Sequence, residues 1–200
     1  MTLKPYKSIR GECNSLLIIN KSRFNGMIIN VDSVKGANDI LKKIKKEHHD
    51  ASHNCYAYII GKNSEFIKYS DDGEPGGTAG LPMLNVLVKN ELTDVLAICT
   101  RYFGGVKLGG GGLVRAYRAS MSKTLKNCDI ITYVPCDIYS VVISYDIWSK
   151  IEVRVKAAHA LIFKTEYLEK IHVTIGLKDE HKTDVFNIIN RALKVINAFE

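Results

Sequence analysis

Two glycine-rich stretches constrain the fold of this 200-residue chain more than any other feature. Residues 70–80 contain four glycines and one proline, a composition that excludes a regular helix or strand there. Residues 104–112 contain six glycines and lie between an apolar run typical of a buried strand, 95–100, and a helical pattern, 113–127. A glycine-rich segment between a strand and a helix is a common position for a phosphate-binding loop. The second stretch is therefore a candidate anion-binding loop.

The remaining periodicities predict an α+β fold in two domains. Before Pro135 the pattern indicates an antiparallel meander within 6–31, a helix at 34–44, a hairpin over 54–69 and a short helix at 81–90. After Pro135 it indicates a strand at 138–145, a helix at 147–158, a hairpin over 161–177, a helix at 179–189 and a last strand at 193–199. This βαββαβ order is that of the ferredoxin-like fold. We therefore expect one domain over residues 1–135 and a small ferredoxin-like domain over residues 136–200.

The net charge is divided unevenly between these two parts. Residues 1–135 contain 19 lysines and arginines against 12 aspartates and glutamates, a net charge of +7, whereas residues 136–200 contain nine of each. A basic domain beside a neutral one favours a polyanionic partner for the basic domain. The alternative is that a charge of this size serves solubility alone.

The sequence also indicates the cellular compartment of the protein. No apolar run approaches the ~18 residues that a membrane span needs, and the amino terminus lacks the apolar core of a signal peptide. The five cysteines form no Cys-x-x-Cys pair, and such scattered cysteines suit a reducing compartment, where they behave as small buried hydrophobes. We expect a soluble cytoplasmic protein that does not bind a membrane.

The second glycine-rich stretch and its flanks, residues 101–118, contain no acidic residue. Consecutive backbone N–H groups at the start of a helix attract anions, and glycine lets an anion approach the main chain. The segment is neither a Walker loop nor a complete dinucleotide-binding fingerprint. The alternative is that its glycines serve tight turns and close packing. The candidate nucleic-acid- or anion-binding residues are Arg101, Lys107, Gly109, Gly110, Gly111, Gly112, Arg115 and Arg118.

An acidic cluster, Asp71, Asp72 and Glu74, lies in the first glycine-rich stretch. Three carboxylates this close could bind a divalent cation or take part in acid–base chemistry. They could equally cap backbone amides or pair with Arg101 or Arg115 in a structural loop, or contact a partner. Together with His53, they form a second candidate site, for a partner of the loop.

Other reactive side chains do not form a recognisable centre. A zinc site is suggested by His48, His49, His53 and Cys55, but they straddle a helix end and a strand start, so they need not share a face, and the sequence indicates no fourth ligand. No Gly-x-Ser-x-Gly motif marks a nucleophile. We therefore assign no catalytic residue, no metal and no cofactor.

Two long motifs resemble a known family. Residues 70–84 read SDDGEPGGTAGLPML and residues 100–117 read TRYFGGVKLGGGGLVRAY, and together they closely resemble the signature of the Impact/YigZ family. Residues 21–24, 31–33 and 51–56 fit the same pattern. The resemblance implies a first domain that folds like domain 2 of a small-subunit ribosomal protein. It implies a second domain similar to a ferredoxin-like domain of elongation factor G. Both similarities point towards RNA or the ribosome, and the family supplies no catalytic residue to transfer.

We therefore expect a non-enzymatic protein that binds RNA or the ribosome and modulates translation, with a protein partner as a further possibility. The alternative is an enzyme or sensor that holds a phosphorylated ligand with the glycine-rich loop and the acidic loop.

Overall fold

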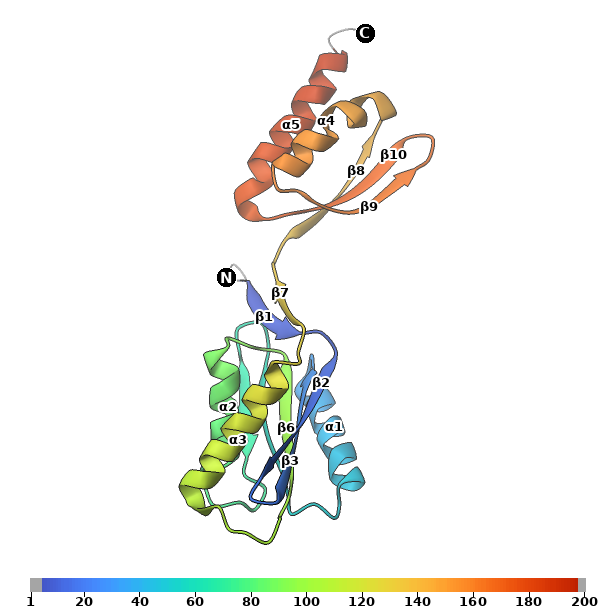
Figure 1. The fold of residues 1–200 in the computed structure, drawn as a ribbon. Coiled ribbons are helices and arrows are strands. Elements are labelled where there is room, and N and C mark those ends of the chain that lie inside the picture. Colours follow the sequence, from blue (N-terminus) through green and yellow to red (C-terminus); the bar gives the residue numbers. More distant parts are fainter. Residues whose placement is uncertain (1–4, 198–200) are drawn as a thin grey trace. The chain divides into compact units, whose positions relative to one another are not determined.

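The computed structural model describes residues 5–197 and divides the chain into two compact units, Met1–Val134 and Pro135–Glu200 (Figure 1). The first unit contains an antiparallel five-stranded sheet with helices on both faces. Its strands, in sheet order, are β2 (Glu12–Ile19), β3 (Ser22–Asn30), β6 (Val95–Tyr102), β4 (His53–Ile60) and β5 (Phe66–Ser70). A separate pair joins β1 (Tyr6–Ile9) to β7 (Ile130–Tyr133). The α+β class predicted from the sequence is confirmed.

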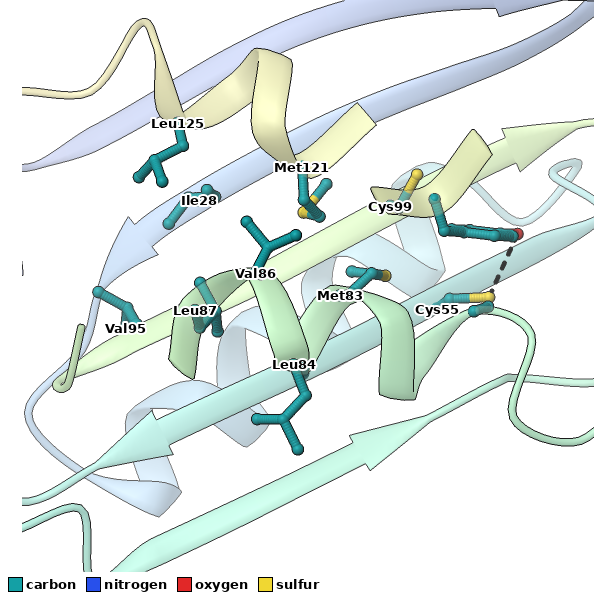
Figure 2. Packing of buried hydrophobic residues seen from close by; sticks show 14 of the residues in the cluster. Ile28, Cys55, Met83, Leu84, Val86, Leu87, Val95, Cys99, Met121 and Leu125 are labelled. Atoms are coloured by element: carbon teal, nitrogen blue, oxygen red, sulfur yellow. Dashed lines mark hydrogen bonds between the residues drawn. The ribbon is translucent and has the colours of Figure 1, made fainter. Parts of the chain in front are cut away.

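One face of the sheet is covered by α2 (Gly80–Lys89) and α3 (Gly109–Leu125), and the other by α1 (Val34–Glu47). The core under α2 and α3 includes Met83, Leu87 and Met121, which Figure 2 shows packed over the strands. The core under α1 is smaller. Because helices cover both faces of β6, its residues 95–101 are all buried. This central strand therefore leads directly from the core into the second glycine-rich stretch.

Three details of the first unit differ from the sequence prediction. The chain does not begin with a three-stranded meander, because Gly11, at a φ of 66°, turns the chain so that β1 pairs with β7 instead of β2. The helix α3 begins at Gly109, four residues earlier than predicted, so the run of four glycines forms its first turn. Cys13 and Cys128 form a disulfide, with Cα atoms 5.3 Å apart, because α3 packs against β2. The expectation that all cysteines are unpaired is therefore wrong for these two, whereas Cys55, Cys99 and Cys136 are free thiols.

The second unit has the first five elements, βαββα, of the ferredoxin-like order βαββαβ. Its elements are β8 (Asp137–Ile143), α4 (Tyr145–Ala157), β9 (Leu161–Tyr167), β10 (Ile171–Leu177) and α5 (Asp179–Asn197). The sheet order is β8-β10-β9, and both helices pack on one face of it. None of the described helices has the length and apolar character to cross a membrane.

The last predicted strand, 193–199, is wrong. Helix α5 continues to Asn197, and residues 198–199 lie outside the described part of the chain. Val185 and Ile189, spaced four residues apart, are buried against the core of this unit, and no glycine or proline follows to end the helix. A short apolar run such as 193–199 fits either a strand or the end of a helix.

Candidate nucleic-acid interface

Arg101, the first of the predicted anion-binding residues, lies inside the fold. Only 5% of the residue is exposed, because it extends from the central strand β6 under the helices. Its Nη1 donates to Glu74 Oε1 at 2.7 Å, and its Nη2 lies 3.4 Å from Ser22 Oγ. The expectation that Arg101 meets phosphates at the surface is therefore contradicted by its burial and its ion pair.

Glu74 is the centre of a buried polar network. Besides Arg101, its Oε1 accepts a hydrogen bond from the Tyr117 hydroxyl at 2.7 Å, and its Oε2 lies 3.8 Å from His53 Nε2. Burial raises the pKa of the Tyr117 hydroxyl far above its usual value, so Tyr117 stays a donor to the carboxylate. The network connects the acidic loop, β4, β6 and α3.

The two aspartates of the acidic cluster also bond within the fold. Asp71 accepts hydrogen bonds from the backbone N–H groups of Gly77, Ala79 and Gly80, at 2.8–2.9 Å, and so caps the start of α2. Asp72 accepts from the Asn54 N–H at 2.7 Å and from Lys45 Nζ at 2.6 Å. Burial opposes the charged form of Asp72, but these two hydrogen bonds together with the positive charge of Lys45 outweigh it and hold the pKa of Asp72 below its usual value.

These contacts bear on the second candidate site and on the enzymatic alternative. The structure brings His53, Asp71, Asp72 and Glu74 together, but it engages their side chains with the protein itself. Residues 5–197 contain no group of three or more His, Cys, Asp or Glu side chains arranged to hold a metal ion. Burial also raises the pKa of the Cys99 thiol to about 12, so this buried cysteine is not a thiolate nucleophile at neutral pH.

The remaining predicted residues lie at the surface, along α3 and the loop before it. Lys107, Arg115 and Arg118 are exposed, as are Gly109, Gly110 and Gly111, while Gly112 is partly buried. No side chain caps the amino terminus of α3, in contrast to α2 with its Asp71 cap. Within the described chain, no ion pair involves Lys107, Arg115 or Arg118.

A groove of about 760 Å³ lies between α2 and α3, and we call it the basic groove. Three cations line it, Lys89 from α2, Arg118 from α3 and Lys126 just after α3. Its other lining residues are Asn85, Val86, Asn90, Ser122, Leu125, Cys128 and Ile130. No carboxylate lines this groove. Three positive charges therefore lie close together in this groove, and the rest of its lining is neutral or apolar.

The sequence analysis missed Lys89 and Lys126. Lys126 follows Arg118 by eight residues, so helical spacing alone places the two on one side of the helix, about two turns apart. Lys89 had no such signal, because its proximity to Arg118 depends on the packing of α2 beside α3.

The two helical faces of the first unit differ in how their cations are paired. Residues 80–90 and 101–128 contain no acidic residue. On α1, by contrast, Lys42, Lys43 and Lys45 each pair with a carboxylate, while Lys35 and Lys46 do not within the part of the chain that the structure describes. The positive charge on the α2–α3 face is thus not compensated by carboxylates of the same helices. This asymmetry argues against charge that serves solubility alone.

Comparisons with known proteins agree with the motifs. A family model described as the Impact N-terminal domain matches residues 20–125. The chain is 38% identical over 185 residues to IMPACT family member YvyE of Bacillus subtilis strain 168, which covers 92% of this chain and 85% of that protein. It is 34% identical over 161 residues to IMPACT family member YigZ of Escherichia coli strain K12, covering 80% of this chain and 79% of that protein. A crystal structure described as that of a hypothetical protein matches with a TM-score of 0.65 and 29% identity, over 92% of this chain and 90% of that one.

Proposed function

This chain belongs to the IMPACT family, and we propose that it is a non-enzymatic protein that binds RNA or the ribosome through its α2–α3 face and modulates translation. The observation that carries the proposal is the basic groove, where Lys89, Arg118 and Lys126 converge without a carboxylate. Contacts between such cations and phosphates would hold RNA in position without reading its sequence.

The distribution of the cations favours a polymer of phosphates over a single phosphorylated ligand. Arg115 and Lys126 lie eleven residues apart along α3, which corresponds to about 16 Å at 1.5 Å per residue. One phosphate group cannot reach both ends of such a row, whereas a polynucleotide backbone can. Lys107 and the first-turn glycines Gly109, Gly110 and Gly111 precede Arg115 in the chain and are exposed as well.

We propose that this RNA is part of the translation machinery, because of the folds that the family resemblance implies. A domain like that of a ribosomal protein and one like that of an elongation factor both suit contact with ribosomal RNA. The engaged carboxylates of the acidic loop favour this binding role over an enzyme that would use them for acid–base chemistry or metal binding.

A salt titration of the full-length protein tests the proposal. We expect binding to 30S ribosomal subunits and to RNA oligonucleotides, with the logarithm of the binding constant falling steeply and linearly with the logarithm of salt concentration. Absence of binding even at low salt would show that the charge serves solubility, and a panel of phosphorylated metabolites would then be the next experiment.

A further inference from the structure

Phe103 exposes an aromatic ring in the loop that leads from β6 into α3. About half of the residue, 49%, is accessible, although it directly follows the buried end of β6. Its backbone is fixed, because its N–H donates to Ser52 Oγ at 3.0 Å. Its ring lies 5.6 Å from the Arg101 guanidinium, which places it on the side of the sheet that carries α2 and α3. About half of Phe103 is therefore not used in core packing.

The support beneath the ring is rigid. The Arg101 guanidinium contacts the Phe103 ring and also the buried Phe24 ring, at 5.3 Å. Glu74 holds that guanidinium through the 2.7 Å ion pair. One part of Phe103 thus packs on a fixed cation while the rest faces solvent, so little conformational entropy is lost when a ligand stacks on it.

Two exposed lysines, Lys21 and Lys107, lie on the turns next to Phe103, and Asp50 lies by the neighbouring Tyr102. A Cβ on Gly104 would overlap the backbone of Lys21, so the exposed turn that contains Lys21 lies against this loop. Lys107 is exposed four residues further on, and the uncapped start of α3 follows. An exposed aromatic ring beside two lysines suits a ligand that carries both a flat ring and phosphate, which is a nucleotide.

The neighbouring aromatic residue, Tyr102, is less accessible to a ligand. Tyr102 is partly buried, its hydroxyl lies 2.8 Å from His48 Nδ1, and the Arg23 guanidinium lies 4.7 Å from its ring. Its hydroxyl is thus engaged within the fold, and less of Tyr102 than of Phe103 is exposed.

We infer that Phe103 stacks on an unpaired nucleobase, so that the loop 103–108 selects single-stranded over duplex RNA. The inference rests on the proposed function and specifies the form of RNA that this face takes. In a duplex both faces of an internal base are covered by neighbouring bases, and Phe103 gains no partner there. Stacking on an aromatic side chain changes affinity by about tenfold per base.

The variants that test this are Phe103→Leu, which removes the aromatic face, and Phe103→Tyr, which keeps it. Phe66→Leu is the matched control, because Phe66 is 57% exposed and lies on the edge strand β5. We expect Phe103→Leu to lower the affinity for an oligoadenylate about tenfold and to leave its salt dependence and the duplex affinity unchanged. Phe103→Tyr and Phe66→Leu should bind as the wild type does.

Equal oligoadenylate affinities for Phe103→Leu and Phe66→Leu would overturn the inference, as would an equal loss on duplex RNA. A second readout uses only the wild-type protein, so it does not depend on whether a variant folds. A single 2-aminopurine in an oligouridylate should lose fluorescence when the protein binds, and binding without this quenching would also overturn the inference. Removal of Arg118 and Lys126 tests the proposed function separately, since those residues contact no base in this account.

Discussion

Arg101 and Glu74 form a buried ion pair, with 2.7 Å between Nη1 and Oε1, that connects the central strand β6 to the acidic loop. Residues that both look functional in the sequence thus neutralise one another inside the fold. The motif residues therefore have two different roles. The buried ion pair holds the loops in place, whereas the exposed cations of α3 remain available to a ligand.

Replacing Glu74 with glutamine should destabilise the protein strongly. The guanidinium of Arg101 would stay buried without its counter-charge, a situation that costs about 3 kcal/mol or more. Urea unfolding measures this loss, with Glu91→Gln as the control, because Glu91 pairs with Lys7 at the exposed surface. An unfolding midpoint of Glu74→Gln equal to that of the control would contradict the structural role of the pair.

Asp72 should make stability depend on pH in the acid range. Its pKa lies below the ordinary value of 3.8 in the folded protein, so the unfolded chain binds the proton more readily. The stabilisation is therefore present above pH 3.8 and is lost as the pH falls through the folded pKa. The stability difference between wild type and Asp72→Asn, measured by denaturant unfolding over this range, should shrink as the pH is lowered. A difference that is constant with pH would show that Asp72 carries no such linkage.

The Cys13–Cys128 disulfide should stabilise the first unit by restricting the unfolded chain. It closes a loop with a sequence separation of 115 residues, for which the expected effect is about 2–5 kcal/mol. Cys128→Ser should lower the urea midpoint, whereas Cys136→Ser, which removes a free thiol, should not. Titration of the unreduced, unfolded protein should find three thiols, the number of free cysteines, and five would contradict the pairing.

Two glycines of the second glycine-rich stretch should respond oppositely to alanine. At Gly104 a Cβ would overlap the Lys21 backbone, so Gly104→Ala should unfold at lower temperature than wild type. At Gly110, in the first turn of α3, a Cβ would meet Thr78 Cγ2 at an ordinary 3.9 Å, so Gly110→Ala should gain stability, up to about 1 kcal/mol. Differential scanning calorimetry compares the two, and equal shifts would show that the close approach at Gly104 has no energetic weight.

Sequence reasoning predicted the element types well where periodicity was long, as in the helix from Val34 and the buried strand β6. It failed where the outcome depended on partners distant in sequence. The pairing of Cys13 with Cys128 and the departure of β1 from the sheet depend on packing that no local pattern encodes. The end of α5 was ambiguous because its short apolar run fits two periodicities.

The candidate site shows the same limit. Sequence reasoning identified Arg115 and Arg118 as neighbours on one helix, and both are exposed. It also grouped Arg101 with them, because residue type and proximity in the chain do not reveal burial. Successive side chains of β6 point to opposite faces of the sheet, and helices cover both faces. Arg101 is therefore buried whichever face it points to.

The most direct test of the account compares two double variants of equal charge loss by salt titration with single-stranded RNA. One removes cations of the basic groove, Arg118→Gln with Lys126→Gln, and the other removes cations of α1, Lys35→Gln with Lys46→Gln. The account predicts that the first lowers the slope of log affinity against log salt by about 1.4, at about 0.7 for each lost phosphate contact, and that the second leaves it near the wild-type value. Equal slopes for the two double variants would contradict the assignment of the α2–α3 face as the RNA-binding surface.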